Sequence, residues 1–315
     1  MTRLNAYLQS LGRRSLSTFW EMARIMVPIM ILIRIAEHYD VIARISPVFV
    51  PAMELVNLPG AAAIVVLTSI LASPYGAIAT LPLLLGLDIT VAQLTAICAM
   101  MLFAHAIPVE QAIVARAGGS FWGTTAVRLL AAVIAAWLID IVSRTTGYLA
   151  QPANLSHFAG LARPESTLGE WAWASISGMG LLAAILFALL LLFDIFDATG
   201  FTRILNGMLA PLMRLAGLDS SVTSITTAGA LLGLAFGGGL IIARGRDPSI
   251  SRRARTDALI WLSLCHGLIE DTAVMVAIGG DFWTLFAGRI LLSLVIIRTW
   301  ILFDRRGKGC ETAAA

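Results

Sequence analysis

The stretch HAIPVEQAIVARAGGSFW, at residues 105–122, decides the fold, because the chain contains a second version of it. The second version is HGLIEDTAVMVAIGGDFW at residues 266–283, and the two lie 161 positions apart. Each copy begins with a histidine, ends in Gly-Gly-x-Phe-Trp and is followed at the same distance by an arginine, Arg128 or Arg289. Chance seldom aligns so many residue types at one offset, so the sequence predicts an internal duplication.

The composition is that of a protein that faces lipid. The 315 residues are 58% hydrophobic and 13% charged, with a mean hydropathy of +0.87, whereas soluble domains carry about 25% charge. Several apolar runs approach the roughly 20 residues that a helix needs to cross the hydrocarbon. These runs are continuous rather than alternating, which favours helices over a barrel. We therefore expect an all-α polytopic membrane protein.

Other classes of protein are not expected. The three cysteines are scattered and odd in number, which argues against a disulfide framework. There is no CxxC pair, GxxxxGK[ST], GxSxG or HExxH motif, so we expect no enzyme, no cofactor and no ATP-driven pump. No cleaved signal peptide is expected at the N-terminus. The net charge of +3 is spread over loops, so we expect no nucleic-acid partner.

The chain divides into two repeats of about five helical segments each. We expect a cytoplasmic N-terminal segment at 1–18, a first repeat at 19–143, a polar linker at 144–173, a second repeat at 174–304 and a cytoplasmic tail at 305–315. The second segment of each repeat is too short for a comfortable span. The expected segments are 19–39, 45–56, 58–85, 90–106 and 124–141, then 174–197, 201–215, 222–242, 258–272 and 285–303. Residues 108–120, between two of these segments, are expected to be a polar connection.

The arginines indicate that the two repeats are inverted. Short loops rich in Lys and Arg stay cytoplasmic. The loop 243–255 holds five arginines, whereas the matching loop 86–90 holds no Lys or Arg. Both termini are basic, so we expect both in the cytoplasm of a bacterial inner-membrane protein. An inverted repeat with interrupted helices is typical of secondary transporters, whose site lies at the midplane between the repeats.

The candidate site consists of ionisable residues where membrane helices end or break. Such residues are costly in a membrane and are usually functional. His266 and Glu270 are four apart and would share a helical face, whereas pairing of His105 with Glu110 needs a distorted turn around Pro108. The alternative is that these groups cap helix ends. We assign no metal ligands, although a His plus carboxylates from each half could bind a divalent ion. The candidate binding residues here are His105, Glu110, His266, Glu270 and Asp271.

Two further groups are candidates. The third segment of each repeat is interrupted, and half-helix N-termini there would present free N–H groups to a solute; close packing of small residues is the alternative. These residues are Ser73, Tyr75 and Gly76, and Phe236, Gly237 and Gly238. Charges near the end of the first segment of each repeat are either gating pairs or plain salt bridges. These residues are Arg34, Glu37, Asp194 and Asp197.

On these motifs the chain resembles the nucleoside-recognition, or Gate, family of bacterial membrane proteins. That family includes spore-maturation proteins A and B and the Gate region of ferrous-iron transporter B. The resemblance rests on the interrupted third segment, the His-Glu stretch and the Gly-Gly-x-Phe-Trp turn, and it covers residues 19–141 and 174–303, as two fused Gate-like units. The family name implies nucleosides. The chain has no cysteine at the broken helices, which argues against ferrous iron.

The sequence therefore predicts a transporter or permease-like protein for a small polar solute, nucleoside-like or an organic anion, with proton or ion coupling through the His/Glu pairs. The expected partners are the solute, membrane lipid and, as a further option, a second copy of the chain. The alternatives are a membrane scaffold or assembly factor that transports nothing, and a transporter of a divalent metal or a lipid.

Overall fold

The computed structural model describes residues 2–156, 167–200, 211–223 and 250–311, together with residues 226, 227, 229, 230, 233, 234 and 242. These residues contain helices and no strand, which confirms the all-α prediction. The elements are α1 (Thr2–His38), α2 (Val41–Leu55), α3 (Ala62–Leu71), α4 (Pro74–Thr80), η1 (Leu81–Leu84), α5 (Val91–Ala104), α6 (Ile107–Arg116), α7 (Phe121–Thr146), α8 (Leu168–Thr199), η3 (Ser220–Val222), α11 (Arg252–Leu264), α12 (Glu270–Ala277) and α13 (Phe282–Glu311).

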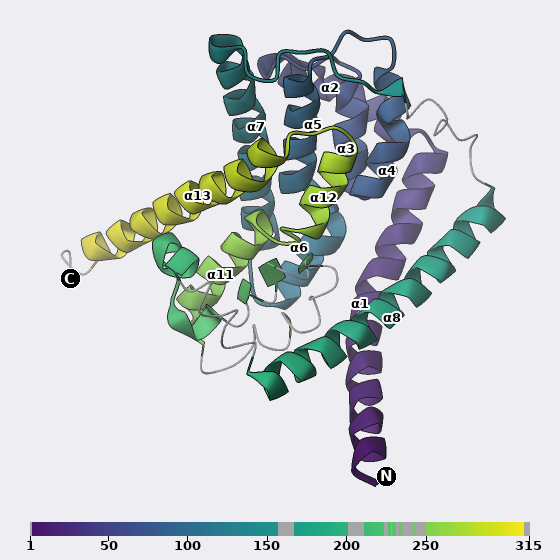
Figure 1. Cartoon of the computed structure of the whole chain (residues 1–315), viewed down its shortest axis with the longest axis vertical. Coiled ribbons are helices and arrows are strands. Elements are labelled where there is room, and N and C mark those ends of the chain that lie inside the picture. The colour runs from purple at the N-terminus through teal and green to yellow at the C-terminus, as the bar shows by residue number, and fades with distance from the viewer. Residues whose placement is uncertain are drawn as a thin grey trace.

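Three stretches of the described part are long and apolar enough to cross a membrane. They are Val91–Arg116, Phe121–Thr146 and Phe282–Phe303, of 26, 26 and 22 residues. The first is the most buried, because α5 lies in the centre of the main body with α7 and α13 beside it (Figure 1). The chain is thus a multi-pass membrane protein whose central crossing is shielded by the others.

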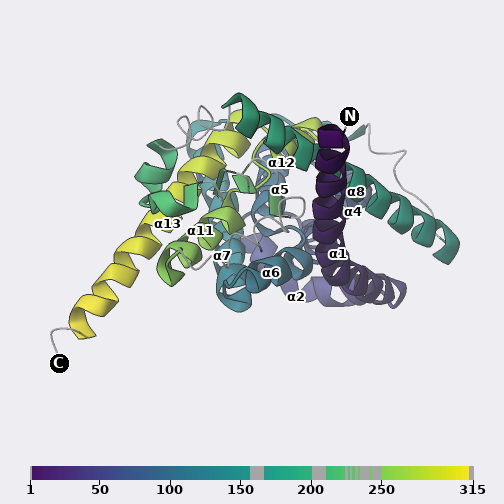
Figure 2. The ribbon, with the colours of Figure 1, turned by 90° about the horizontal axis from the view of Figure 1, so that it is seen from below.

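Helices α1 and α8 cross each other beside this body (Figures 1 and 2). The 37 residues of α1 form one helix, so the predicted N-terminal segment continues without a break into the first predicted span. At the crossing, Asp194 of α8 accepts hydrogen bonds from the Tyr7 hydroxyl at 2.7 Å and from Arg14 at 2.5 Å. The two helices are therefore joined by polar contacts as well as by packing.

Local residue choices explain where the central helices begin. The Thr90 hydroxyl accepts from the backbone N–H of Gln93, and the Gln93 side chain accepts from that of Thr90, which is a complete capping box at the start of α5. The Ser120 hydroxyl caps α7 by accepting from the Gly123 N–H, and Asp281, at the equivalent position, accepts from the Thr284 N–H in the first turn of α13. Ser120 and Asp281, at equivalent positions of the two copies, therefore both cap the helix that follows them.

One segment was predicted wrongly. Residues 108–120 were expected to be a polar connection, but they include α6, which begins just before Pro108 and ends at Arg116. Proline is tolerated in the first turn of a helix because its missing N–H has no partner there anyway. Glu110 and Gln111 of this segment are buried, whereas Arg116 and Ser120 are exposed, so the polar residues did not indicate a surface loop.

The two copies contact each other reciprocally, as a twofold relation requires. A Cβ added to Gly119 would lie 3.0 Å from Leu259, and one added to Gly280 would lie 3.2 Å from Cys98. Gly280 is 161 positions after Gly119, and Leu259 is 161 positions after Cys98. The pair Gly118–Arg255 and the pair Gly279–Leu94 repeat the pattern. These reciprocal pairs are the contacts expected if residues 91–128 and 252–289 are two copies of one unit related by a pseudo-twofold axis.

Candidate functional site

Both histidines lie at helix breaks. Helix α5 ends at Ala104, His105 is extended, and Ala106 takes the left-handed conformation with φ 45° before α6 begins. This is the distorted turn that pairing of His105 with Glu110 required. Helix α11 ends at Leu264, and Gly267 has φ 54° before α12 begins at Glu270. His105 falls near the centre of the 26-residue stretch Val91–Arg116.

The two imidazoles are held by equivalent main-chain bonds. His105 Nδ1 lies 2.8 Å from the carbonyl oxygen of Met101, and His266 Nδ1 lies 2.7 Å from that of Leu262. Each carbonyl belongs to the residue four before the histidine, in the last turn of α5 or α11. Because a carbonyl only accepts, Nδ1 carries the hydrogen and Nε2 points away from the helix end.

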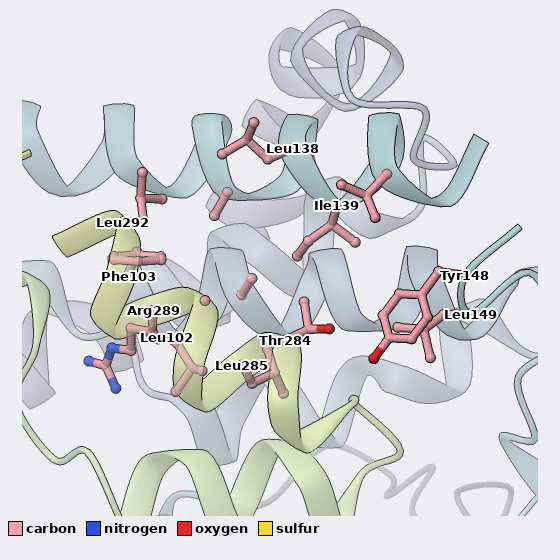
Figure 3. Close-up of a pocket in the computed structure, with 14 residues that line it drawn as sticks. Leu102, Phe103, Leu138, Ile139, Tyr148, Leu149, Thr284, Leu285, Arg289 and Leu292 are labelled. Carbon is pink, nitrogen blue, oxygen red and sulfur yellow. The ribbon is translucent and has the colours of Figure 1, made fainter. Parts of the chain in front are cut away.

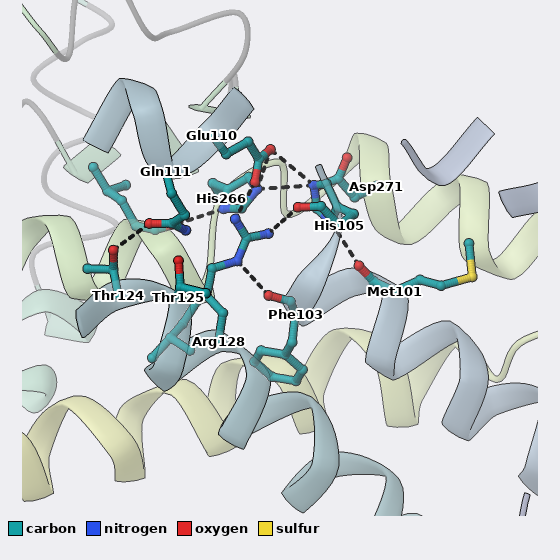
Figure 4. A network of polar contacts seen from close by, with 12 residues as sticks. Met101, Phe103, His105, Glu110, Gln111, Thr124, Thr125, Arg128, His266 and Asp271 are labelled. Carbon is teal, nitrogen blue, oxygen red and sulfur yellow. Dashed lines mark hydrogen bonds and ion pairs between the residues drawn. The ribbon is translucent and has the colours of Figure 1, made fainter. Parts of the chain in front are cut away.

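The Nε2 atoms of the two histidines meet between the repeats (Figure 4). They lie 3.2 Å apart, and Glu110 Oε1 is 3.2 Å from His105 Nε2 and 3.1 Å from His266 Nε2. His105, Glu110 and His266 are 4%, 3% and 1% exposed. Three side chains that are far apart in the sequence therefore form one buried cluster. We use the name His–Glu cluster for these three residues together with Asp271, Arg128 and Arg289, which are described below.

Arg128 completes the first-repeat side of the cluster. It is 0% exposed. Its NH1 donates to Glu110 Oε2 at 2.5 Å, its Nε donates to the Phe103 carbonyl at 2.6 Å, and its NH2 donates to the His105 carbonyl at 2.8 Å. The carbonyls are among those left free where α5 ends, and a buried guanidinium is stable only with such partners.

Arg289 occupies the equivalent place in the second repeat with fewer bonds. Its Nε donates to the Leu264 carbonyl at 3.0 Å, as Arg128 does to Phe103. Its NH1 lies 3.9 Å from Asp271 Oδ2, too far for a hydrogen bond. Among the described residues, neither terminal nitrogen of Arg289 nor Asp271 Oδ2 has a hydrogen-bond partner. The arginine and the carboxylate are therefore hydrogen-bonded in the first repeat, which we call the closed half of the cluster, and separated in the second repeat, which we call the open half.

Asp271, and not Glu270, is the counterpart of Glu110. Asp271 Oδ2 lies 3.8 Å from His105 Nε2, which mirrors the contact of Glu110 with His266. The predicted face shared by His266 and Glu270 does not exist, because the chain between them is not helical. Glu270 is the first residue of α12, is exposed, and has the Tyr75 hydroxyl as its neighbour.

The broken third segment of the first repeat is confirmed. Helix α3 ends at Leu71, and Ser73 caps α4 by accepting from the Gly76 N–H at 3.1 Å. Tyr75 is 62% exposed and has Glu270 and Asp271 as its charged neighbours. The backbone of this break is joined to the cluster, since the Ala106 N–H donates to the Ser69 carbonyl. The predicted residues Phe236, Gly237 and Gly238 lie outside the described residues.

The predicted charge pairs are placed only in part. Asp194 binds Arg14 and Tyr7, as described above, rather than an equivalent of Arg34. This contact is an ion pair between two helices. Arg34 is partly buried on α1. The side chains of Glu37 and Asp197 lie outside the described part of the structure.

An apolar cavity of about 180 Å³ adjoins the cluster. It lies between α5, α7 and α13, and Phe103 and Arg289 form its end nearest the cluster (Figure 3). Thr284 and Tyr148 contribute the polar groups of its lining, and the rest is almost entirely aliphatic. The guanidinium of Arg289 is directed toward the cluster, so the cavity meets the carbon stem of this side chain.

The two arginines were not among the predicted site residues, although the sequence carried the signal. Arg128 and Arg289 share the offset of the histidines, as Glu110 and Asp271 do. Each arginine binds or faces the carboxylate of its own half. The sequence could not show that main-chain carbonyls at the helix breaks would be their other partners.

The comparisons agree with this architecture. Residues 19–121 match the Gate family, described as "Nucleoside recognition". The chain is 29% identical over 301 residues to the uncharacterized membrane protein YvoD of Bacillus subtilis (strain 168), an alignment that covers 93% of this chain and 95% of that protein. No solved structure matches the chain. The protein is therefore a multi-pass membrane protein whose segment 19–121 is similar to the Gate family.

Proposed function

We propose that the protein is a transporter for a small polar solute, nucleoside-like or an organic anion, in the bacterial inner membrane. The observation that carries the proposal is the His–Glu cluster itself. Six ionisable side chains meet at helix breaks on a pseudo-twofold axis, near the centre of a membrane crossing. Buried charge at that depth is costly and is retained where a solute, proton or ion is handled.

The unequal halves of the cluster support alternating access. Arg128 and Glu110 are bonded, whereas Arg289 and Asp271 are apart. In an inverted repeat the opposite-facing state has the two halves exchanged, so Arg289 would close on Asp271 while Arg128 releases Glu110. The free polar atoms of the open half are then where a polar solute is recognised.

The inverted topology is tested by the equivalent starts of α5 and α11. In a variant in which Cys98, Cys265 and Cys310 are serine, we expect Asp88→Cys and Arg252→Cys to react with membrane-impermeant maleimide from opposite sides. Both positions are exposed, and arginine-rich loops stay cytoplasmic. Labelling of intact cells and of inverted vesicles measures the two sides. If both cysteines react from the same side, the repeats are not inverted.

The solute class is tested by thermal stabilisation of the detergent-purified protein. We expect one class, among nucleosides, nucleobases and organic anions, to raise the Tm, because a ligand that binds the folded state stabilises it by RT ln(1 + [L]/Kd), about 2.7 kcal/mol at 100 times Kd. Uptake of that solute into proteoliposomes should then follow.

The variant for this test is Asp271→Asn, which removes a charge from an oxygen that has no hydrogen-bond partner in the described structure. It should fold and lose the stabilisation. His38→Ala, at the exposed end of α1, is the control and should keep it. Absence of a response to every solute class, in a protein that folds, would contradict the transport proposal.

A further inference from the structure

The ligand-type atoms at the centre of the His–Glu cluster form a nearly equilateral triangle. The distances among His105 Nε2, His266 Nε2 and Glu110 Oε1 are 3.1 to 3.2 Å. Three ligands at about 2.0–2.1 Å from one ion have this separation when they subtend angles of about 100° at the ion. That angle lies between those of an octahedral and a tetrahedral site, so one face of either would fit these three atoms.

The hydrogen bonds of the two histidines also favour a bound cation. Because Nδ1 of each histidine donates to a main-chain carbonyl, each neutral ring presents a lone pair at Nε2. The carboxylate of Glu110 is also an acceptor. Three acceptors therefore converge with no donor among them, an arrangement that is repulsive unless a cation lies between them. Histidines whose Nδ1–H is tied to the backbone, with Nε2 directed at a common point, are the usual outer-shell arrangement of metal sites.

The ligand atoms of His105, Glu110 and His266 are close enough to share one ion, and Asp271 lies next to this group and would reach the ion by a shift of its side chain. The Asp271 Oδ2 is buried, has no hydrogen-bond partner among the described residues and lies 3.8 Å from His105 Nε2. A single proton would bridge two of the three acceptors of the triangle and leave the third unsatisfied, whereas one metal ion satisfies all three. Glu110 can ligate through Oε1 because its Oε2 is already bound to Arg128.

We propose that the cluster binds one divalent transition-metal ion through His105, His266 and Glu110, with Asp271 as fourth ligand. Two imidazoles and two carboxylates suit Zn²⁺, Mn²⁺, Fe²⁺ or Co²⁺ better than Mg²⁺ or Ca²⁺, which prefer oxygen ligands alone. The two carboxylates already face two arginines, so the ion adds positive charge. An anion in an open coordination position would offset that charge, and the free terminal nitrogens of Arg289 could donate to it.

The test is metal binding by the full chain, purified with an affinity tag that contains no histidine. After chelator treatment the protein is titrated with Co²⁺, whose visible absorption reports its ligands, and bound metal is measured by mass spectrometry. We expect about one ion per chain, displaced by Zn²⁺. His266→Ala and Glu110→Gln should lose it, and Asp271→Asn should bind at least 10-fold more weakly. His38→Ala, the control, should bind normally.

A stoichiometry below about 0.1 in the folded wild-type protein would overturn the proposal and leave a shared proton as the bridging cation. Equal binding by His266→Ala would overturn it as well. If that variant does not fold, X-ray absorption of the Co²⁺-loaded wild type decides, because imidazole ligands give a distinct signal and their absence contradicts the site. The inference rests on ligand geometry and not on transport, so metal binding without a solute response, and the reverse, are separate results.

Discussion

Arg128→Met is expected to lower the free energy of unfolding by about 3–5 kcal/mol, the cost of removing one partner of a buried ion pair. Methionine fills much of the volume of the arginine stem but donates nothing. It leaves the Glu110 carboxylate and the carbonyls of Phe103 and His105 without the donor that each has now. The measurement is denaturant or thermal unfolding of the protein in detergent.

The matched control lies on the same helix. Arg144 pairs with Asp140 at 2.7 Å, but its side chain is 61% exposed, so Arg144→Met should cost no more than about 1 kcal/mol. Adding Glu110→Gln to Arg128→Met should recover part of the loss, because the uncompensated charge is then gone. If Arg128→Met and Arg144→Met cost the same, the buried pair does not stabilise the fold in the way described.

Gly280→Ala is expected to destabilise the protein by about 1–3 kcal/mol, as overpacking does. The new methyl group would lie 2.6 Å from Leu285 Cδ1, 3.0 Å from the Met275 carbonyl oxygen and 3.2 Å from Cys98 Sγ. The leucine can move, but the carbonyl belongs to the backbone and accepts a hydrogen bond from Gly280 itself. Because Cys98 belongs to the other repeat, the strain falls on the contact between repeats.

Gly288→Ala is the control for this change. Gly288 lies in α13, and an added Cβ there meets nothing within 4 Å. This substitution should be neutral or slightly stabilising, since alanine is favoured over glycine inside a helix by roughly 0.5–1 kcal/mol. The Tm values of both variants and of the wild type measure the difference. A loss of stability in Gly288→Ala that matches that of Gly280→Ala would show that the close contact is not the cause.

Much of the site followed from one offset in the sequence. The positions of His105 and His266 at helix breaks were predicted, because a charged group in an apolar run marks an end or an interruption. Glu270 was included in the cluster because a helical spacing of four was assumed. The offset of 161 alone would have selected Asp271. Periodicity failed here because Gly267, in a left-handed conformation, separates the two helical segments.

Other features could not be read from the sequence. Residues 108–120 were expected to be a connection because polar residues are scattered through them, yet α6 is helical and its Glu110 is buried. A polar side chain is expected to be exposed only if it has no buried partner. Glu110 has such a partner in Arg128, which comes from a different helix. The unequal bonding of Arg128 and Arg289 also has no counterpart in the sequence, where the two arginines are equivalent.

The reciprocal contacts of Gly119 and Gly280 have a consequence for the ancestry of the molecule. A single unit with this surface could pair with an identical copy, and its axis would then be exact, with both carboxylates necessarily the same. Joining the units in one chain removes that requirement, since each half can change alone. The present glutamate at 110 and aspartate at 271 are a difference of one methylene that no symmetric pair of identical units could carry. With both units in one chain, the carboxylates at 110 and 271 can differ while the glycine contacts around them stay equivalent.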